Sequence, residues 1–277
     1  MKPIVVLYHN DEDGFGAAWA AWKKFKDKTS YIPVEYKNRV AYLEKLKNKE
    51  IYLLDLCFNE KTMKKLLEGN KKLVVIDHHI GRKEECKIST ERVFDIKSSA
   101  AVLSWKFFYP GRPMPNLLRY VEDFDIWKLK MPHTRELFAS LDTFKFNFKI
   151  WNKLVSDFQS VKRRKKHIET GRAILKYQDN MLRKIVSSGE NVILNGHKAF
   201  AVNSPILESE IGHYIYENKG VLGIIWSYQN GVFKTSLRSN KKIDASKLAK
   251  KFGGGGHKGA AGFIFNSKIN FPWKKTK

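Results

Sequence analysis

Three short apolar runs, separated by helix-like segments, constrain the fold of this chain more than any other feature. The runs are residues 3–8, 51–54 and 73–76, and the helix-like segments are 15–25, 59–67 and 100–108. Runs of Val, Ile and Leu are typical of buried strands, and Asn59 can cap the second helix. Strands that alternate with helices predict an α/β domain with a mainly parallel sheet and helices on both faces.

The pattern changes in the second part of the chain. Residues 116–188 have helical spacing, and the dipeptides Asn195-Gly196 and Asn230-Gly231 each separate two strand-like runs, as hairpin turns do. Asp244 can cap a further helix that a run of glycines then ends. We therefore predict a smaller α+β domain at the end of the chain. The predicted division is a catalytic domain at 1–150, a helical connector at 151–189 and a second domain at 190–277.

The charge of the chain favours a polyanionic partner. Among 277 residues, 52 Lys and Arg oppose 28 Asp and Glu, which gives a formal net charge of +24. Such a field attracts nucleic acids and speeds their encounter with the protein. The alternative is a basic enzyme from a lysine-rich proteome, without any nucleic-acid role. The basic run at 162–166 has the same two interpretations, a solvated helix face or a set of phosphate contacts.

The sequence also bears on location. No apolar run is long enough to cross a bilayer, and the N-terminus enters a strand-like segment without a signal peptide. Cys57 and Cys86 form neither a disulfide framework nor a zinc site, which agrees with a reducing compartment. We expect a cytoplasmic protein with no membrane partner. The sequence leaves its oligomeric state open.

Side chains that can bind metal ions follow each of the three predicted strands. They are His9, Asp11 and Asp13 after the first, Asp55 after the second, and Asp77, His78 and His79 after the third. Because the carboxyl ends of strands form the binding crevice of an open α/β sheet, we expect these groups to converge. A single aspartate after a strand more often caps a turn or a helix, but three groups together favour a metal site.

The chemistry of these side chains indicates which ions they would bind. Carboxylates gathered without a cation would repel one another and raise one another's pKa. Oxygen and imidazole ligands suit Mn²⁺, with Mg²⁺ or Co²⁺ as alternatives. Two such ions would relieve the repulsion, activate a water and hold the oxygens of an in-line phosphoryl displacement.

The motifs, in this order, resemble those of a known family. His9-Asn10-Asp11-Glu12-Asp13-Gly14, Asp55 and Asp77-His78-His79 look like the ordered motifs of DHH phosphoesterases, and Gly253-Gly254-Gly255-Gly256-His257 with Ala260-Ala261-Gly262-Phe263 resembles the glycine-rich motif of DHHA1 domains. The resemblance covers nearly the whole chain. It implies a phosphoesterase of the DHH/DHHA1 superfamily, similar to nanoRNases and oligoribonucleases and related to RecJ-type exonucleases.

The resemblance also implies a role for each matching residue. One metal ion would be held by His9, Asp11 and Asp55, and the other by Asp13, Asp55, His78 and a later acid. Asp77 would orient the histidines, and His79 would face a substrate phosphate. The later acid is expected to be Asp125, with Asp123 as the alternative, although residues 122–127 lack the Asp-Thr-Gly form of many nanoRNases.

In the second domain, the resemblance implies a grip on one end of the substrate. The implied substrate-binding residues are Arg238, Gly254, Gly255, Gly256 and His257. An arginine on a strand could make a bidentate contact with a phosphate, but Arg238 could equally be an ordinary surface residue. The active site is expected in a cleft between the two domains, with the indole of Trp127 beside it as a candidate for base stacking.

The expected activity is hydrolysis of short single-stranded RNA or DNA, or of related nucleotides, to nucleoside monophosphates with two divalent ions. Within the same superfamily, the alternatives are a single-strand DNA exonuclease, a phosphatase of 3′-phosphoadenosine 5′-phosphate, a cyclic-dinucleotide phosphodiesterase and a polyphosphatase. An alternative of another class is a nucleic-acid-binding module without catalysis. Such a module would have no use for the complete set of acids and histidines.

Overall fold

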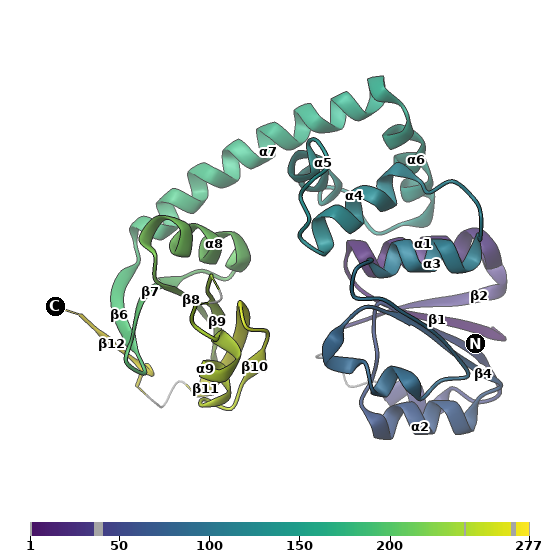
Figure 1. The fold of residues 1–277 in the computed structure, drawn as a ribbon, viewed down its shortest axis with the longest axis horizontal. Coiled ribbons are helices and arrows are strands. Elements are labelled where there is room, and N and C mark those ends of the chain that lie inside the picture. Colours follow the sequence, from purple (N-terminus) through teal and green to yellow (C-terminus); the bar gives the residue numbers. More distant parts are fainter. Residues whose placement is uncertain (1, 36–40, 241, 267–269, 277) are drawn as a thin grey trace. The chain divides into compact units, whose positions relative to one another are not determined.

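The computed structural model of the chain describes residues 2–35, 41–240, 242–266 and 270–276. The chain divides into two compact units, Met1–Leu175 and Lys176–Lys277. The division falls within one long helix, α7 (Val161–Ser187), which is labelled in Figure 1.

The first unit contains a five-stranded parallel sheet. Its strands are β1 (Ile4–His9), β2 (Thr29–Val34), β3 (Glu50–Leu54), β4 (Lys72–Asp77) and β5 (Glu91–Phe94), in the spatial order β2-β1-β3-β4-β5. Its helices before α7 are α1 (Glu12–Phe25), α2 (Glu60–Gly69), α3 (Ala100–Phe108), α4 (Asn116–Asp125), α5 (Thr134–Leu141) and α6 (Phe148–Gln159). Every neighbouring pair of strands is parallel, which confirms the predicted fold class.

The two faces of this sheet are buried in two separate cores. Val6 and Tyr8 of β1 belong to the larger core, together with residues of α1 and α3. Val5 and Leu7 belong to the other core, in which Met63 of α2 is also buried. Figure 1 shows α1 and α3 on one side of the sheet and α2 on the other. Because successive side chains of a strand point to opposite faces, burial of both faces requires the continuous apolar runs seen in the sequence.

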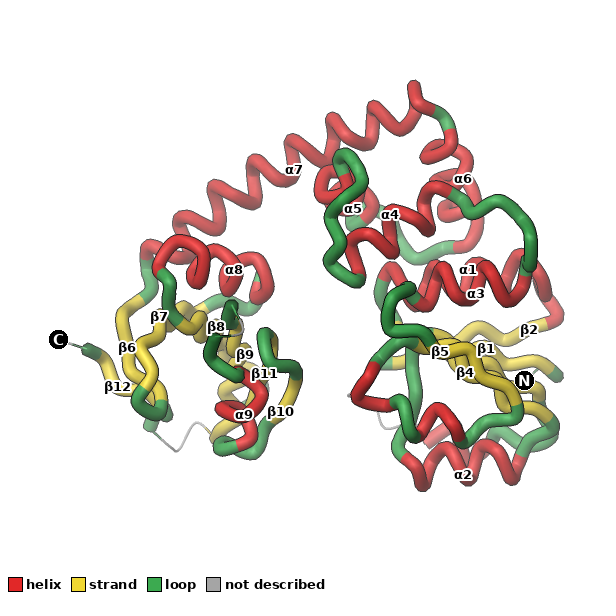
Figure 2. Tube along the Cα trace, in the orientation of Figure 1, coloured by secondary structure: helices red, strands yellow, loops and turns green. Residues whose placement is uncertain are grey.

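Two strands of this sheet are not indicated by the sequence, and both lie at its edges (Figure 2). β2 contains Pro33, which lacks an N–H group and is tolerated in a sheet at an edge. β5 is only four residues long, and all of its side chains are exposed or half-buried. An edge strand is covered less completely than a central one, so it needs no continuous apolar run.

The second unit contains a mixed sheet with a helix on each face. Its strands are β6 (Glu190–Leu194), β7 (His197–Asn203), β8 (Leu222–Gln229), β9 (Val232–Arg238), β10 (Gly255–Gly256), β11 (Ala260–Asn266) and β12 (Trp273–Lys275), in the order β10-β11-β9-β8-β7-β6-β12, and its helices after α7 are α8 (Glu208–Lys219) and α9 (Ala245–Lys250). Ile211 and Ile215 of α8 pack in one core and Leu248 of α9 in the other. The predicted α+β arrangement of this part of the chain is confirmed.

Both hairpins predicted for this unit are present. β6 pairs with β7, and β8 with β9, in antiparallel register. The turn residues Asn195, Gly196, Asn230 and Gly231 all have positive φ, the backbone conformation that makes Asn-Gly the preferred dipeptide for a tight hairpin. Over the residues that the structure describes, none of the helices has the length and apolarity needed to cross a lipid bilayer.

Candidate metal centre

The first group of candidate ligands lies where β1 passes into α1. Asp11 is the N-cap of α1 and accepts a hydrogen bond from the amide of Gly14 at 2.9 Å. Its other carboxylate oxygen lies 2.6 Å from Nδ1 of His9, the last residue of β1. A Cβ at position 14 would lie 2.1 Å from the carbonyl oxygen of His9. Only glycine therefore lets α1 start so close to the strand, and this approach holds His9 and Asp11 together.

Asp13 is buried in the first turn of α1 and faces the start of another helix. Its two carboxylate oxygens accept hydrogen bonds from the amides of Ala100 and Ala101 at the N-terminus of α3, at 2.7 and 2.9 Å. Its Oδ2 also lies 3.6 Å from Nε2 of His78. Burial raises the pKa of Asp13, and the nearby His78 offsets part of that effect. The helix N-terminus fixes the carboxylate and favours its negative charge.

Asp55, just after β3, is the common member of the contacts in this region. Its Oδ2 lies 3.5 Å from Nδ1 of His9, and its Oδ1 lies 3.3 Å from Nε2 of His78 and 3.6 Å from Nδ1 of His79. Burial, and next the charge of Asp13, raise the pKa of Asp55 well above its ordinary value. A buried carboxylate with this pKa is electrostatically costly unless a cation lies beside it.

The backbone of Asp55 is also unusual. It has φ +59°, the left-handed conformation, which costs a residue with a side chain about 1–3 kcal/mol. The amide of Asp55 donates to the carbonyl oxygen of Ile76 in the neighbouring strand β4 at 2.9 Å, which holds the residue in place. This conformation turns the side chain of Asp55 toward His9 and His78, and nothing in the sequence indicates it.

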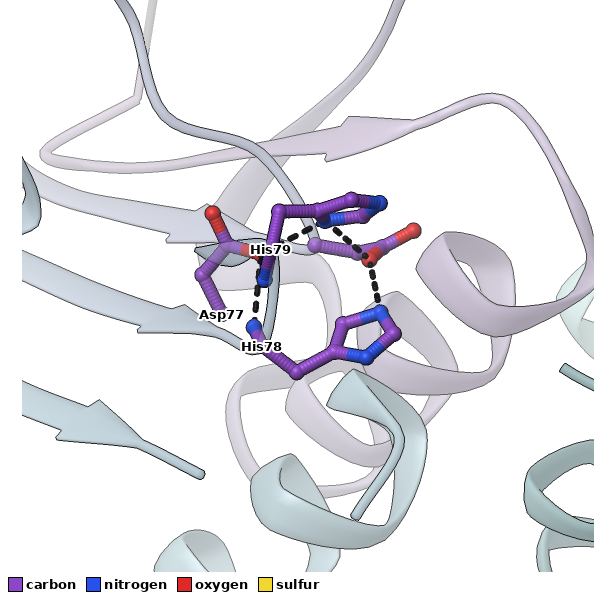
Figure 3. A group of neighbouring side chains, drawn as sticks. Asp77, His78 and His79 are labelled. Carbon is purple, nitrogen blue, oxygen red and sulfur yellow. Dashed lines mark hydrogen bonds and ion pairs between the residues drawn. The ribbon is translucent and has the colours of Figure 1, made fainter. Parts of the chain in front are cut away.

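Asp77, His78 and His79 form a compact turn at the end of β4 (Figure 3). Oδ1 of Asp77 accepts hydrogen bonds from the amides of His78 and His79, at 2.7 and 3.1 Å, and lies 2.8 Å from Nδ1 of His79. The thiol of Cys86 contacts the other oxygen, Oδ2, at 3.7 Å. Burial alone raises the pKa of Asp77, but the hydrogen bonds and charge of His79, together with the amide of His78, outweigh burial and hold the pKa below its ordinary value. Asp77 is thus an ionised buried group that orients the turn.

The structure distinguishes the two acids of α4. Oδ2 of Asp125 lies 3.5 Å from Nε2 of His78, within the group of ligand candidates. The carboxylate of Asp123 instead accepts hydrogen bonds from the amides of Lys130 and Met131, both at 3.0 Å, and from the hydroxyl of Thr134 at 2.6 Å. Asp123 therefore closes the loop that follows α4, and Asp125 is the one beside His78.

The ligand candidates fit a divalent metal site on two observations. They fall into three overlapping groups, namely Asp55 with Asp77, His78 and His79; His9 with Asp11 and Asp55; and Asp13 with His78 and Asp125. Oδ1 of Asp55 and Nε2 of His78 are buried, and neither has a hydrogen-bond partner within the described part of the chain. Buried polar atoms are normally paired. A carboxylate oxygen and an imidazole nitrogen left facing each other are the donors that a divalent ion such as Mn²⁺ takes.

Proton affinities in the cluster agree with this interpretation. Hydrogen bonds with Asp11 and then Asp55 raise the pKa of His9 to about 10. Burial, followed by the charge of Asp13, raises the pKa of Asp125 to about 8. Without a cation the cluster therefore retains protons near neutral pH, and a bound cation would displace them.

The glycine-rich segment of the second unit contains two different kinds of glycine. A Cβ at Gly254 would lie 2.1 Å from the carbonyl oxygen of Gly262, and Gly256 has φ +138°. A Cβ at Gly255, by contrast, would meet nothing within 4 Å. Packing and backbone conformation thus explain Gly254 and Gly256, whereas Gly255 presents open backbone that a ligand can approach closely.

Arg238 and His257 lie near each other within the second unit. Arg238 pairs with Ala260 across β9 and β11, and the amide of His257 donates to the carbonyl oxygen of Ala260 at 2.7 Å. The half-buried guanidinium of Arg238 donates to Oγ of Ser209 at 3.3 Å, and burial lowers its pKa. No carboxylate in the described ranges lies within ion-pair distance of it, although the charges of Glu208 and Glu210 act on it from farther away.

Two residues that the sequence does not single out support the metal centre. Glu122 accepts hydrogen bonds from the amide of Ser99, the N-cap of α3, at 3.3 Å and from the ammonium of Lys128 at 2.9 Å. It therefore ties α4, which carries Asp125, to the helix that holds Asp13. Cys86 contacts the oxygen of Asp77 that faces away from the histidine amides. The sequence signals none of these contacts, because each depends on how the chain turns between the two partners.

Comparison with known proteins identifies the family. Residues 209–272 match the DHHA1 domain. Over 300 residues the chain is 30% identical to uncharacterized protein R106 of Acanthamoeba polyphaga mimivirus, covering 98% of this chain and 70% of that protein. It is also 26% identical over 294 residues to oligoribonuclease NrnB of Bacillus subtilis, covering 94% of this chain and 72% of NrnB. The chain belongs to the DHH/DHHA1 superfamily.

Several solved structures share the fold of this chain. The DHH domain of a member of a family of ribosomal proteins aligns with a TM-score of 0.66 and 16% identity, covering 96% of this chain and 83% of that one. The pGpG-specific phosphodiesterase PggH of Vibrio cholerae aligns with a TM-score of 0.55 and 14% identity, over 96% and 94% of the two chains. RecJ of Thermus thermophilus in complex with Mn²⁺ aligns with a TM-score of 0.58 and 16% identity, over 96% of this chain and 50% of RecJ.

Proposed function

We propose that this DHH/DHHA1 protein is a Mn²⁺-dependent phosphodiesterase that hydrolyses short single-stranded oligonucleotides to nucleoside monophosphates. The observation that carries the proposal is the pair of buried atoms without hydrogen-bond partners in the described residues, Oδ1 of Asp55 and Nε2 of His78, at the centre of three overlapping groups of metal ligands. Side chains from the ends of three strands and two helices meet here, and a protein that only bound nucleic acid would gain nothing from such a costly cluster of acids.

Two divalent ions are proposed at this centre, and Asp55 would be a ligand of both. His9, Asp11 and Asp55 would hold one ion, and Asp13, Asp55, His78 and Asp125 would hold the other. When bound, such ions supply an activated water and neutralise the charge of the transferring phosphoryl group. Asp13 and Asp55 are the ligands most strongly fixed by the fold, because each is buried and held by backbone hydrogen bonds.

The proposed catalytic residues beside the ions are Asp77 and His79. Asp77 lies 2.8 Å from Nδ1 of His79, so the opposite nitrogen of the ring is left for another partner. The ring is about a third exposed, whereas Asp77 is fully buried. Asp77 would therefore hold the ring in one orientation, and His79 would donate a hydrogen bond to a phosphate oxygen of the substrate.

The choice of substrate depends on the relatives and on charge. NrnB is named as an oligoribonuclease and PggH as a phosphodiesterase of the dinucleotide pGpG. A net charge of +24 favours an oligonucleotide over a mononucleotide. Arg238, the open backbone at Gly255 and the neighbouring His257 are proposed to bind a terminal phosphate, with Gly254 and Gly256 shaping that loop.

The proposal also includes a division of the chain and a location. The chain would consist of a catalytic part at 1–150, a connector at 151–189 and a substrate-binding part at 190–277. The proposed location is the cytoplasm, which fits two free cysteines.

One panel of assays tests the proposed activity. Purified protein with Mn²⁺ would be given RNAs and DNAs of two to about five nucleotides, longer strands, 3′-phosphoadenosine 5′-phosphate, cyclic dinucleotides and polyphosphate, with Mg²⁺ and Co²⁺ in parallel. We expect the highest kcat/KM on the short oligonucleotides, with monophosphate products. Turnover of polyphosphate or cyclic dinucleotides alone would replace the proposed substrate. Absence of turnover on every compound, with oligonucleotide binding intact, would favour the binding module.

A further inference from the structure

Most of the large apolar side chains that are exposed on the first unit lie close to proposed metal ligands. Among the described residues of this unit, the exposed ones are Ile80, Ile96, Trp127 and Val161. Ile80 directly follows the Asp77-His78-His79 turn, and Ile96 comes two residues after β5, the strand that pairs with β4. Trp127 is separated from Asp125 by a single residue. Apolar groups that are exposed around one site, unlike single scattered ones, indicate a binding surface.

Trp127 is the largest of these side chains, and 54% of it is exposed. Neighbouring Cα atoms are about 3.8 Å apart, so Cα of Trp127 lies at most about 7.6 Å from Cα of Asp125. Oδ2 of Asp125 in turn lies 3.5 Å from Nε2 of His78. The indole therefore lies within reach of a nucleotide whose phosphate is at the metal centre.

The loop that carries Trp127 has an unusual backbone. Trp127 has φ +55° and Leu129 has φ +49°, and both values are left-handed. The amide of Trp127 donates to the carbonyl oxygen of Phe124 at 3.0 Å, and the amide of Leu129 donates to that of Asp123 at 3.0 Å. Bulky residues rarely adopt this conformation, because it costs stability. Residues that are held in it cluster at sites where ligands bind.

Contacts on either side of Trp127 keep this loop in place. The ammonium of Lys128 donates to Glu122 at 2.9 Å and to the carbonyl oxygen of Lys97, in the segment after β5, at 3.3 Å. The ring of Trp127 packs against that of Phe124 at an angle of 64°, with the ring centroids 5.5 Å apart. Trp127 thus presents an ordered ring to solvent. An ordered ring loses little conformational entropy when it binds a ligand.

We propose that the indole of Trp127 stacks on a base of the nucleotide whose phosphate lies at the metal centre. This inference rests on the proposed function and deepens it, because it makes the base as well as the phosphate a determinant of substrate choice. Every base has a flat π face, so stacking selects no sequence. Trp127 would instead favour substrates that carry a base over polyphosphate, which offers the ring nothing to stack on.

Dinucleotides with and without a base test this proposal. The parent substrate is a 5′-phosphorylated adenine dinucleotide, and two further substrates lack the adenine of the 5′ or of the 3′ nucleoside. With Mn²⁺ present, kcat and KM are measured for the full-length wild type, Trp127→Leu, Trp127→Phe and a matched control. The control is Tyr177→Leu, which removes another exposed aromatic ring, 66% of which is open to solvent.

Trp127→Leu should raise KM for the parent dinucleotide at least about fivefold, because loss of one stacked base costs about 5- to 150-fold in affinity. Its kcat should be nearly unchanged. On one of the two substrates that lack a base, Trp127→Leu should have no effect, since the stacking partner is already absent. Trp127→Phe keeps a ring and should recover much of the affinity, and Tyr177→Leu should behave as the wild type does.

A further variant separates base binding from a role in packing. Trp127→Gly relieves the left-handed backbone but loses the contact with Phe124. These effects oppose each other, so the melting temperature should stay within a few degrees of the wild-type value. KM for the parent dinucleotide should nevertheless rise as it does in Trp127→Leu.

Two results would overturn the proposal. One is an unchanged KM for the parent dinucleotide in Trp127→Leu. The other is an equal rise in KM for all three substrates, which would mean that Trp127 shapes the protein and does not contact a base.

Failure of the proposed function would be recognised separately, as absence of hydrolysis by the wild type. Binding alone then tests the inference, with a dinucleotide that contains 2-aminopurine, whose fluorescence is quenched when it stacks. Quenching that is lost in Trp127→Leu and kept in Tyr177→Leu would support the stacking role without any turnover. Equal quenching in the two variants would refute it.

Discussion

Nε2 of His78 lies 3.3 Å from Oδ1 of Asp55, and both atoms are buried without a hydrogen-bond partner in the described part of the chain. Two buried polar groups in this state lower the stability of the metal-free protein. A divalent cation would bind both atoms at once and remove this cost. The metal centre should therefore lower the stability of the metal-free protein while it serves the proposed function.

The first prediction follows from this loss of stability. In the presence of a chelator, Asp55→Asn should raise the free energy of unfolding by about 1–3 kcal/mol, because it removes a buried charge beside Asp13. Added Mn²⁺ should raise the melting temperature of the wild type but not that of the variant. Hydrolysis should fall at least about a thousandfold, while oligonucleotide binding is largely kept. Turnover at the wild-type rate in Asp55→Asn would refute the assigned centre.

Asp123 and Asp125 provide a matched pair for the second prediction. Asp123→Asn places an amide group against backbone and hydroxyl donors, and it should cost about 3 kcal/mol of unfolding free energy. Asp125→Asn should leave the melting temperature of the metal-free protein equal or higher and should reduce Mn²⁺ affinity. Thermal denaturation and metal titration of the two variants separate these outcomes. The reverse result, in which Asp123→Asn alone lowers Mn²⁺ affinity, would exchange their roles.

The convergence of the candidate ligands could be predicted from the sequence because parallel strands align their carboxyl ends at one edge. His9, Asp55 and His78 each follow a central strand, so topology alone brings them together. The choice between Asp123 and Asp125 could not be predicted in this way. Both lie on one helix two residues apart, and only tertiary contacts decide which faces His78.

Other features depend on local conformation or on contacts between distant residues. The left-handed backbone of Asp55 has no sequence signal, because aspartate tolerates this conformation but adopts it at only a minority of positions. The thiol of Cys86 reaches Asp77 through the turn after β4, and its sequence context suggests only an ordinary buried cysteine. The glycine run predicts a close approach of backbone but does not distinguish Gly255 from its neighbours.

The third prediction concerns Asp77, which orients His79 without being a proposed metal ligand. Asp77→Asn keeps the shape of the side chain but removes the charge that fixes the proton on Nδ1 of His79. Loss of such an orienting group typically costs 10–100-fold in metal affinity or activity. We expect kcat to fall by about that factor, with KM for a dinucleotide nearly unchanged. A variant with unchanged kcat would show that His79 needs no orienting partner.

The glycine run yields a fourth prediction with an internal control. Gly254→Ala would place a Cβ 2.1 Å from the carbonyl oxygen of Gly262, so it should destabilise the second unit by about 2 kcal/mol or more. Gly255→Ala has open space around its Cβ and should leave the melting temperature within a degree or two. If substrate approaches the backbone at Gly255, that variant should raise KM for a dinucleotide and leave folding intact. An unchanged KM would remove Gly255 from the substrate-binding residues.

The last prediction is a pH dependence that the metal should abolish. Burial and the charge of Asp13 raise the pKa of Asp125 to about 8 in the folded protein without metal, well above the value of about 3.9 in an unfolded chain. A carboxyl whose pKa is raised by folding contributes stability below the unfolded pKa and loses that contribution as pH rises through the folded pKa. With a chelator present, the melting temperature should therefore fall between about pH 4 and pH 8, and Asp125→Asn should make this decline shallower. Saturating Mn²⁺ should remove most of the decline, and its binding at pH 7 should release protons that buffer-dependent calorimetry detects. A pH profile that is the same with and without Mn²⁺ would mean that no cation binds beside Asp125.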